Sequence, residues 1–303
     1  MEFFSATMIA ARKSLPSFFR FGPGDIEGEN GALKLANDVL TGEPKKVTGE
    51  QMKQRKHTEK NRRAASKLAE EELKIAAKIL EWEIGDIWGH VGVRLPEQDG
   101  VAVQMFRRPE ENGKDDWLVR FDYSLKKLSG VGTVPRESTI YTEIFKARPD
   151  VNAVVHSHAP MCIALSLADK ALACVHMQSF RFGEGVPIYP KPIYILDEAE
   201  GADLARVLDQ AAGVMIKGHG IVTVGKTIDE ASMNALYMER TAKIQAVAHL
   251  LGFTGPTEEF LDELEASKNK LFSRRQLKMT HSAEWNYYAD KIKKKEKWTR
   301  GWT

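Results

Sequence analysis

The chain has 303 residues, 43% of them hydrophobic, and a net charge of +2, so it can bury a sizeable core while its charge favours no class of partner. Its two cysteines, Cys162 and Cys174, are too few for a disulfide framework and match no zinc-ribbon or redox-pair spacing, which favours a reducing compartment. No apolar run approaches the roughly 18–20 residues of a membrane-spanning helix, so we expect a soluble cytoplasmic protein without a membrane partner.

Residues 1–60 are predicted to form an N-terminal arm and linker. Arg12, Lys13 and Arg20 stand among serines and phenylalanines, a composition that resembles a mitochondrial transit peptide or suits an arm packed on the body of the protein or on a neighbouring subunit. The stretch from Lys45 to Arg63 holds eight Lys or Arg against two Glu without interleaved aromatic residues. This pattern favours a solvated helical face over a nucleic-acid site.

The next segments predict a helix followed by strands. From about Asn61, apolar residues recur at three- and four-residue steps, which indicates an amphipathic helix that ends near Gly85. The segment 87–96 alternates instead, as a strand does, and its polar face holds His90, Gly92 and Arg94. Further predicted elements are strands at 101–106 and 117–121 and a helix at 136–150.

The second half of the chain continues this alternation of strands and helices. The run before His156 is apolar and mostly β-branched, with Val151, Ala153, Val154 and Val155, which predicts a buried strand. Closely spaced prolines at 187–195 indicate a loop or an edge strand. The other predicted elements are a helix at 159–168, strands at 212–217 and 221–225, a helix at 228–251 and a charged helical tail beyond Gly252.

Three histidines form a pattern typical of a metal site. His156 and His158 follow the apolar run of the predicted buried strand, and His219 lies in a glycine-flanked GHG turn. Residues two apart on a strand share a face, so the first two rings stand side by side. Burial without partners would cost about 1–3 kcal/mol for each ring, and a shared metal ion removes that cost. Three protein ligands with an open fourth position indicate a catalytic site. The spacing alone leaves open the alternative that these are ordinary core histidines.

Four sequence blocks resemble the class II aldolase/adducin family in order and spacing. They are GHVGVR, PRESTIYTEIFKARPDVNAVVHSHAP, KGHGIVTVGKTIDEA and ALYMERTAKIQ. The resemblance implies an α/β fold, with a three-layer αβα catalytic domain at 61–252 around a largely antiparallel or mixed central sheet. A C-terminal helical tail at 253–303 follows. The resemblance also implies a homotetramer with active sites at subunit interfaces.

The resemblance further implies roles for the site residues. His156, His158 and His219 correspond to the family's metal ligands, and Glu137 corresponds to its catalytic acid/base. Zinc is the expected divalent metal, with iron, cobalt, nickel or manganese as alternatives that also suit three imidazoles. The ion stabilises the enolate that carbon–carbon cleavage leaves, and the carboxylate moves the proton. The alternative for Glu137 is a structural position at a helix N-terminus.

The GHVGVR block departs from the phosphosugar branch of the family. That branch places small polar residues there to hold phosphate, whereas Gly92 has no hydroxyl group to offer. An unphosphorylated substrate is therefore expected, with His90 and Arg94 as binding groups for a carboxylate. Further candidates, from regions that contact substrate in related enzymes, are His176, Tyr287 and Tyr288. For His176 a polar core position, and for the two tyrosines an anchor on a neighbouring subunit, are the alternatives.

The expected partner of this site is a small-molecule substrate, and the sequence leaves three functions open. The first is a metal-dependent carbon–carbon lyase that cleaves an unphosphorylated hydroxy-carbonyl or hydroxy-carboxylate substrate through a metal-stabilised enolate, as class II aldolases do. The second is a decarboxylase of a hydroxylated aromatic or heteroaromatic acid that uses the same site. The third, from another class, is a non-catalytic adducin-like interaction protein. Retention of three histidines and Glu137 argues against the third, because a scaffold needs no converging imidazoles.

Overall fold

The computed structural model describes residues 49–95, 100–106, 118–271 and 282–294. By the density of its contacts the chain divides into two units, Met1–Lys60 and Asn61–Thr303. The expectations for the first 48 residues, an arm or a targeting segment, lie outside the described residues. None of the described helices is both long enough and apolar enough to cross a membrane.

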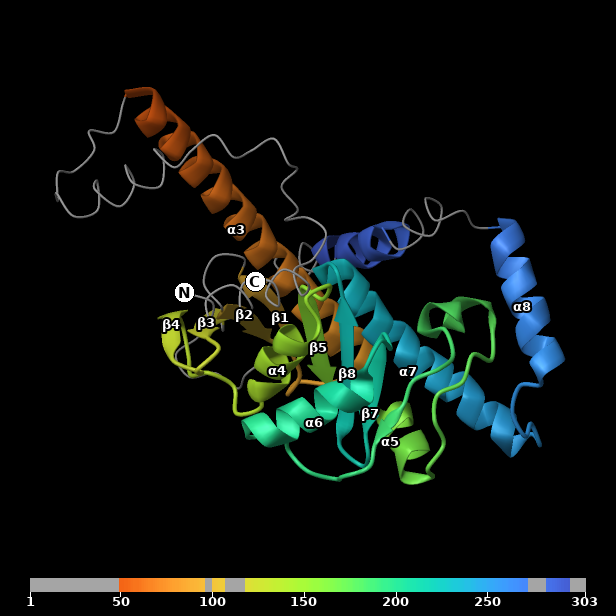
Figure 1. Ribbon diagram of the computed structural model, residues 1–303. Helices are drawn as coiled ribbons and strands as arrows, with labels where there is room; N and C mark the ends of the chain where they lie inside the picture. Colours follow the sequence, from red (N-terminus) through yellow and green to blue (C-terminus); the bar gives the residue numbers. More distant parts are fainter. Residues whose placement is uncertain (1–48, 96–99, 107–117, 272–281, 295–303) are drawn as a thin grey trace, which may run out of the picture. The chain divides into compact units, whose positions relative to one another are not determined.

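An eight-stranded sheet forms the centre of the second unit (Figure 1). Its strand order is β4-β3-β2-β1-β5-β8-β7-β6, and every neighbouring pair is antiparallel except β6 and β7. The strands are β1 (His90–Leu95), β2 (Gly100–Met105), β3 (Leu118–Asp122), β4 (Lys127–Gly130), β5 (Ala153–Ser157), β6 (Ile188–Tyr189), β7 (Gly213–Ile216) and β8 (Gly220–Gly225).

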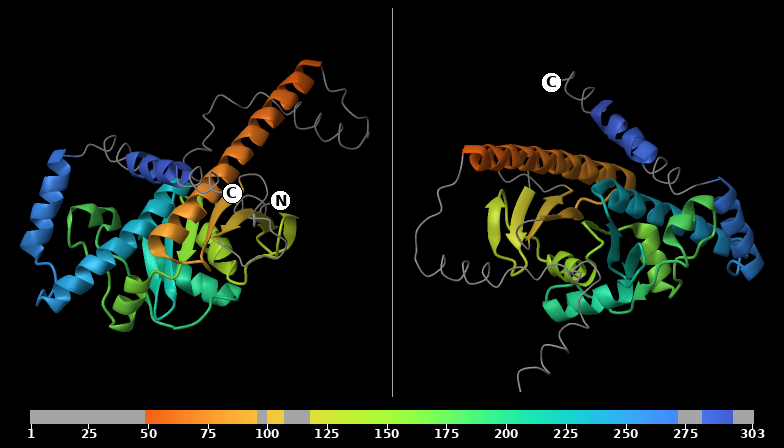
Figure 2. Two further views of the ribbon diagram at one scale, coloured as in Figure 1. Left: turned by 180° about the vertical axis from the view of Figure 1, so that it is seen from behind. Right: turned by 45° about the horizontal axis from the view of Figure 1, so that its top comes forward.

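Helices precede, connect and follow these strands, as the further views in Figure 2 show. They are α3 (Gly49–Ile84), α4 (Thr139–Ala147), α5 (Pro160–Leu167), the 3-10 helix η2 (Met177–Phe182), α6 (Glu198–Leu208), α7 (Ile228–Leu250) and α8 (Glu258–Leu271). Residues 282–294 are also helical.

The helices cover both faces of the sheet. One cluster of buried residues joins α3, α5 and α7 to one face, with Leu80 and Met238 among its members. A second cluster joins α4 and α6 to the other face and includes Leu204. Val154 and Val155 are successive residues of β5 and belong to different clusters, as the alternation of a strand requires. The expected three-layer αβα arrangement around a mixed, mostly antiparallel sheet is confirmed.

Most of the predicted elements are present with ends shifted by a few residues. The prolines at 187–195 surround β6, which lies at the edge of the sheet as predicted. Helix α3 begins at Gly49, before the amphipathic repeat that starts near Asn61, and includes residues 49–63 of the basic stretch, which is also predicted to be helical. The predictions lack β4, η2 and α6. Helix α6 begins with a capping box in which Asp197 and Glu200 each accept the other's backbone N–H.

The central strands place the site residues next to one another. In the register of the sheet, His90 of β1 lies opposite His156 of β5, and His156 in turn lies opposite Val222 of β8. The turn between β7 and β8 carries His219, and Gly218 before it has a φ of +65°, a left-handed conformation that favours glycine. Residues far apart in the sequence therefore meet beside three adjacent strands.

Candidate active site

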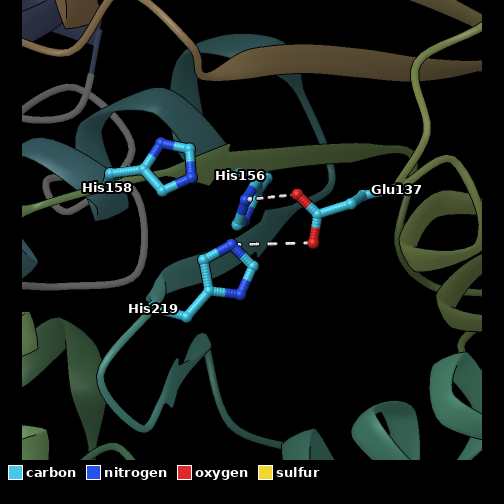
Figure 3. Close-up of side chains that lie close together, drawn as sticks. All are labelled: Glu137, His156, His158 and His219. Carbon is cyan, nitrogen blue, oxygen red and sulfur yellow. Dashed lines mark ion pairs between the residues drawn. The ribbon is translucent and has the colours of Figure 1, made fainter. Parts of the chain in front are cut away.

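Three histidines and a glutamate lie close together in the second unit (Figure 3). His156 lies on β5, His158 follows the end of that strand, and His219 lies in the turn between β7 and β8. Glu137 comes from the segment that leads into α4. The centroids of the three imidazole rings lie between 4.9 and 5.3 Å apart. The fold thus brings together the four residues predicted to be ligands and acid/base.

Backbone carbonyl groups orient two of the three rings. The Nδ1 atom of His156 lies 3.0 Å from the carbonyl oxygen of Ile221, and that of His219 lies 2.8 Å from the carbonyl oxygen of Ile193. A carbonyl oxygen can only accept, so both rings donate from Nδ1 and keep a lone pair on Nε2. This is the tautomer in which Nε2 binds a metal ion.

Asp86 orients the third ring, and the sequence analysis does not identify this residue. Its Oδ2 atom accepts hydrogen bonds from the Nδ1 of His158 at 3.1 Å, from the backbone N–H of His158 at 2.8 Å and from the hydroxyl of Ser157 at 3.1 Å. Burial raises the pKa of Asp86, but the hydrogen bonds from His158 lower it by more, so the group is a carboxylate. A single aspartate after the helix end gives no pattern that spacing could detect.

The carboxylate of Glu137 faces two of the Nε2 atoms. Its Oε2 lies 3.4 Å from Nε2 of His156, and its Oε1 lies 3.6 Å from Nε2 of His219. Both distances exceed the roughly 2.7–3.2 Å of an N–H···O hydrogen bond, and both Nε2 atoms are buried without a hydrogen-bond partner. The ligand atoms of all four residues lie within 4.8 Å of one another. Because unpartnered buried nitrogens are costly, this donor set fits a divalent cation.

The charges of the site also suit a cation. Burial raises the pKa of Glu137, but contacts with His156 and His219 lower it by more, so its pKa lies well below the usual range. Burial lowers the pKa of His156, which favours the neutral ring. Burial also lowers the pKa of His219, but the contact with Glu137 outweighs it and the net shift is upward. A bound cation would compete with that proton for the same lone pair.

A cavity of about 740 Å³ opens beside these side chains. Arg136 at its wall is exposed and has no ion pair or hydrogen bond with any other described residue, so it can receive an anionic group. The ring of Tyr194 lies 5.0 Å from that of His219. The apolar part of the wall consists of Trp88, Met105, Val134, Pro135, Tyr194 and Leu196. The cavity therefore combines a cationic group with flat and aliphatic surfaces.

Of the two residues predicted to bind a carboxylate, His90 lines this cavity and Arg94 does not. Burial is the largest cause and the nearby His156 the second of a shift that lowers the pKa of His90 to about 3, so its ring is neutral at pH 7. The guanidinium of Arg94 instead donates to backbone carbonyl oxygens, those of Phe145, Arg148 and Val151. These contacts join β1 to the end of α4. Arg94 thus has a structural place, and Arg136 is the arginine at the cavity.

The remaining candidates lie away from the cavity in this chain. The Nδ1 atom of His176 accepts the backbone N–H of Gln178 and so caps η2, while its Nε2 lies 3.0 Å from the hydroxyl of Thr241. Tyr288 is buried in a third cluster between the helix at 282–294 and helices α3 and α7. Tyr287, on the same helix, is exposed. Tyr288 therefore packs within its own chain, whereas the exposed Tyr287 is placed where a neighbouring subunit could contact it.

Comparisons with known proteins agree with this geometry. The family described as "Class II Aldolase and Adducin N-terminal domain" matches residues 81–246. The 3,4-dihydroxyphthalate decarboxylase of Arthrobacter keyseri is 27% identical over 190 residues, which cover 57% of this chain and 76% of that protein. The L-fuculose phosphate aldolase of Escherichia coli is 27% identical over 177 residues, which cover 58% and 79%.

A solved structure shares the fold. The L-fuculose 1-phosphate aldolase from Glaciozyma antarctica PI12 superposes with a TM-score of 0.61 at 23% identity, over 82% of this chain and 94% of that chain. The family match spans more than half of the present chain and contains Glu137 and the three histidines. The chain is therefore an enzyme, a lyase of the class II aldolase/decarboxylase type, and it belongs to the class II aldolase and adducin N-terminal domain family.

Proposed function

We propose that this chain is a metal-dependent decarboxylase of hydroxylated aromatic or heteroaromatic acids. The observation that carries the proposal is the set of Nε2 atoms and the Glu137 carboxylate beside a cavity with aromatic and aliphatic walls. The wall offers Trp88 and Tyr194 for a planar ring and the free Arg136 for a carboxylate. Similarity to 3,4-dihydroxyphthalate decarboxylase supports the same reaction class.

Nε2 atoms of His156, His158 and His219 would hold the divalent ion, with Glu137 next to it. We propose zinc first, because three imidazoles and an open position are common in catalytic zinc sites, with iron, cobalt, nickel or manganese as alternatives. When bound, such an ion supplies positive charge that stabilises the electron pair left on the substrate by bond cleavage. Asp86 and the two carbonyl groups hold the rings in the required tautomer.

Glu137 is proposed to move the proton. As a carboxylate it accepts the proton of the substrate hydroxyl group while the bond between ring carbon and carboxyl carbon breaks. The electron pair of that bond stays with the ring, and carbon dioxide leaves. Glu137 then returns the proton to the same ring carbon, so atoms and charge balance. The backbone N–H of Ile195, at 3.0 Å, holds its Oε1 atom in place.

Aldol cleavage of an unphosphorylated hydroxy-carbonyl substrate is the second candidate. The similarity to L-fuculose phosphate aldolase favours it, and the electronic problem is the same because an electron pair must again be stabilised next to an oxygen. Gly92 offers no hydroxyl group for a phosphate. The substrate of either reaction is therefore proposed to lack phosphate.

A product assay tests both candidates. The zinc-loaded protein is incubated with hydroxylated benzoic and phthalic acids and, separately, with unphosphorylated hydroxy-ketoacids. The proposal expects carbon dioxide from an aromatic acid and none from the same incubation with His158→Ala. Release of an aldehyde from a hydroxy-ketoacid, with no carbon dioxide from any aromatic acid, would replace it by the aldolase reaction.

We also propose that the enzyme is a cytoplasmic homotetramer. Trp88, Tyr194 and Leu196 line the cavity and are 58%, 66% and 51% exposed, so apolar surface gathers at its mouth. Apolar patches of this kind are typical of surfaces that a partner covers, and a second copy of the chain would cover this one.

A further inference from the structure

His90 lies at the cavity but outside the group of metal ligands. It is 3% exposed, lines the cavity, and has its ring centroid 5.1 Å from that of His156 on the adjacent strand. The close group of potential ligand atoms among the described residues contains Glu137 and the other three histidines, without His90. The Nε2 atom of His90 has no hydrogen-bond partner among the described residues. Its role must therefore differ from that of its neighbours.

The hydroxyl group of Tyr141 determines which nitrogen of His90 carries the proton. Tyr141, on α4, is fully buried, and its hydroxyl oxygen lies 2.6 Å from Nδ1 of His90. This is the only hydrogen bond of that hydroxyl group with the described part of the chain. If Nδ1 carried a proton, the hydroxyl proton would be buried without an acceptor, at a substantial desolvation cost. Tyr141 therefore donates to Nδ1, and the ring proton lies on Nε2, the nitrogen without a protein partner.

Gly92 makes room for this arrangement. It lies two residues after His90 on β1 and so shares its face of the sheet. A Cβ atom at Gly92 would lie 2.4 Å from Cε1 and 2.7 Å from Cδ1 of the Tyr141 ring. Because those ring atoms are packed in the core, no larger residue fits without moving Tyr141. Gly92, which departs from the phosphosugar pattern, thus leaves the space that the Tyr141 ring occupies.

We propose that His90 contacts the substrate as a neutral hydrogen-bond donor, giving its Nε2–H to an anionic carboxylate or phenolate oxygen. Tyr141 and Gly92 act as positioning residues for it. A fixed donor of this kind stabilises charge that develops on an oxygen and needs no reorganisation during the reaction. The inference rests on the proposed function, because it requires an anionic substrate in this cavity.

Nitrogen NMR of the zinc-loaded protein, with labelled histidine, tests the proton position without any turnover. We expect a protonated Nε2 and an unprotonated, hydrogen-bonded Nδ1 for His90, assigned through its loss in His90→Gln. Tyr141→Phe should move the Nδ1 resonance toward that of an unbonded nitrogen. Tyr123→Phe, which removes another tyrosine hydroxyl packed at the same core cluster, should leave it unchanged. A proton on Nδ1 of His90, or an Nδ1 resonance that is unchanged in Tyr141→Phe, overturns the inference.

Two substitutions of His90 test the donor itself. The amide nitrogen of Gln reaches about as far along the side chain as Nε2, whereas that of Asn reaches only as far as Nδ1. With salicylate as the probe, we expect His90→Asn to weaken binding about tenfold, the value of one hydrogen bond to a charged group, and His90→Gln to weaken it clearly less. Equal losses in the two variants contradict the role of Nε2–H. If salicylate binding and NMR behave as expected but no aromatic acid is decarboxylated, the proposed function fails and the donor role stands.

Discussion

At the scale of single residues, the site is defined by how its rings are held. Spacing and resemblance identify the three histidines and Glu137, because these residue types at these positions form a recognisable pattern. They do not identify Asp86, Tyr141 or Arg136, whose roles depend on which side chains the fold places beside the ligands. Arg94 is the opposite case. Its place on the polar face of a strand predicts a contact with substrate, but its guanidinium donates to backbone carbonyl oxygens.

Glu137→Gln should separate proton transfer from binding. The amide keeps the shape of the side chain, so we expect zinc content and probe affinity to stay near those of the parent while turnover falls by about 10²–10⁴. Glu143→Gln is the matched control and should stay within a few-fold of the parent, because Glu143 is a second buried glutamate, lies on α4 and pairs with Lys146. Zinc analysis and product formation measure both effects. Turnover of Glu137→Gln near that of the parent would remove the assigned role, and loss of zinc would make Glu137 a ligand.

Asp86→Asn should weaken the metal site. The amide can present its NH₂ group to Nδ1 of His158 and no longer provides the negative charge that fixes the ring, so zinc affinity should fall about 10–100-fold. Asp122→Asn is the control, because Asp122 accepts hydrogen bonds only within its exposed turn. Competition against a zinc chelator gives both affinities. Unchanged affinity in Asp86→Asn would show that the carboxylate contributes nothing to the site.

At the scale of elements, the longer periodic segments are the ones that the sequence predicts best. Strands β1, β5, β7 and β8 and helices α4, α5 and α7 follow from alternation and helical repeats. Helix α6 is not among the predicted elements, although its buried residues, Gly201, Leu204, Ala205 and Leu208, recur at three- and four-residue steps and Asp197 and Glu200 form a capping box at its start. The first part of α3 lies in the basic stretch, which the sequence predicts to be helical from its charge pattern and not from apolar repeats.

Helix α5, which begins two residues after His158, is capped by another helix. Its N-cap residue, Ala159, has no side chain able to cap, and the carboxylate of Glu239 on α7 accepts the backbone N–H groups of Met161 and Cys162 instead. Glu239→Ala should therefore lower the free energy of unfolding by about 1–2 kcal/mol. Glu259→Ala, an exposed acidic residue in the first turn of α8, should cost far less. Urea denaturation compares the two, and equal losses would contradict the capping role.

At the scale of the whole molecule, removal of the metal should lower stability without unfolding the chain. Each of the two main core clusters is built from apolar residues of the sheet and its helices, so we expect the fold to persist without the ion. Zinc bound only to the native state should add about 4 kcal/mol when its free concentration is 1,000 times Kd. Thermal unfolding with and without a chelator measures the difference. For His158→Ala, the chelator should change the unfolding temperature very little. A parent protein whose unfolding temperature is also unchanged by the chelator would argue against the metal site.

Assembly is the remaining prediction at this scale. Light scattering at micromolar concentration should give the mass of a tetramer, because the exposed apolar residues at the cavity mouth need a partner surface. Trp88→Lys should shift the distribution toward smaller species, while Tyr287→Lys, at an exposed position on the helix at 282–294, tests the tail as an anchor. A monomeric mass for the parent protein would contradict the proposed assembly. The apolar residues at the cavity mouth would then contact substrate only.

The way the rings are held also sets how the site tolerates mutation. Two of the three Nδ1 acceptors are backbone carbonyl oxygens, at Ile193 and Ile221, and every amino acid provides one. Substitutions at these positions can alter packing but cannot delete the acceptor. The third acceptor is the side chain of Asp86, which most substitutions abolish. In a library that samples all substitutions, variants that keep the fold but lose the metal should therefore gather at Asp86 and the ligands, and should be rare at residues 193 and 221.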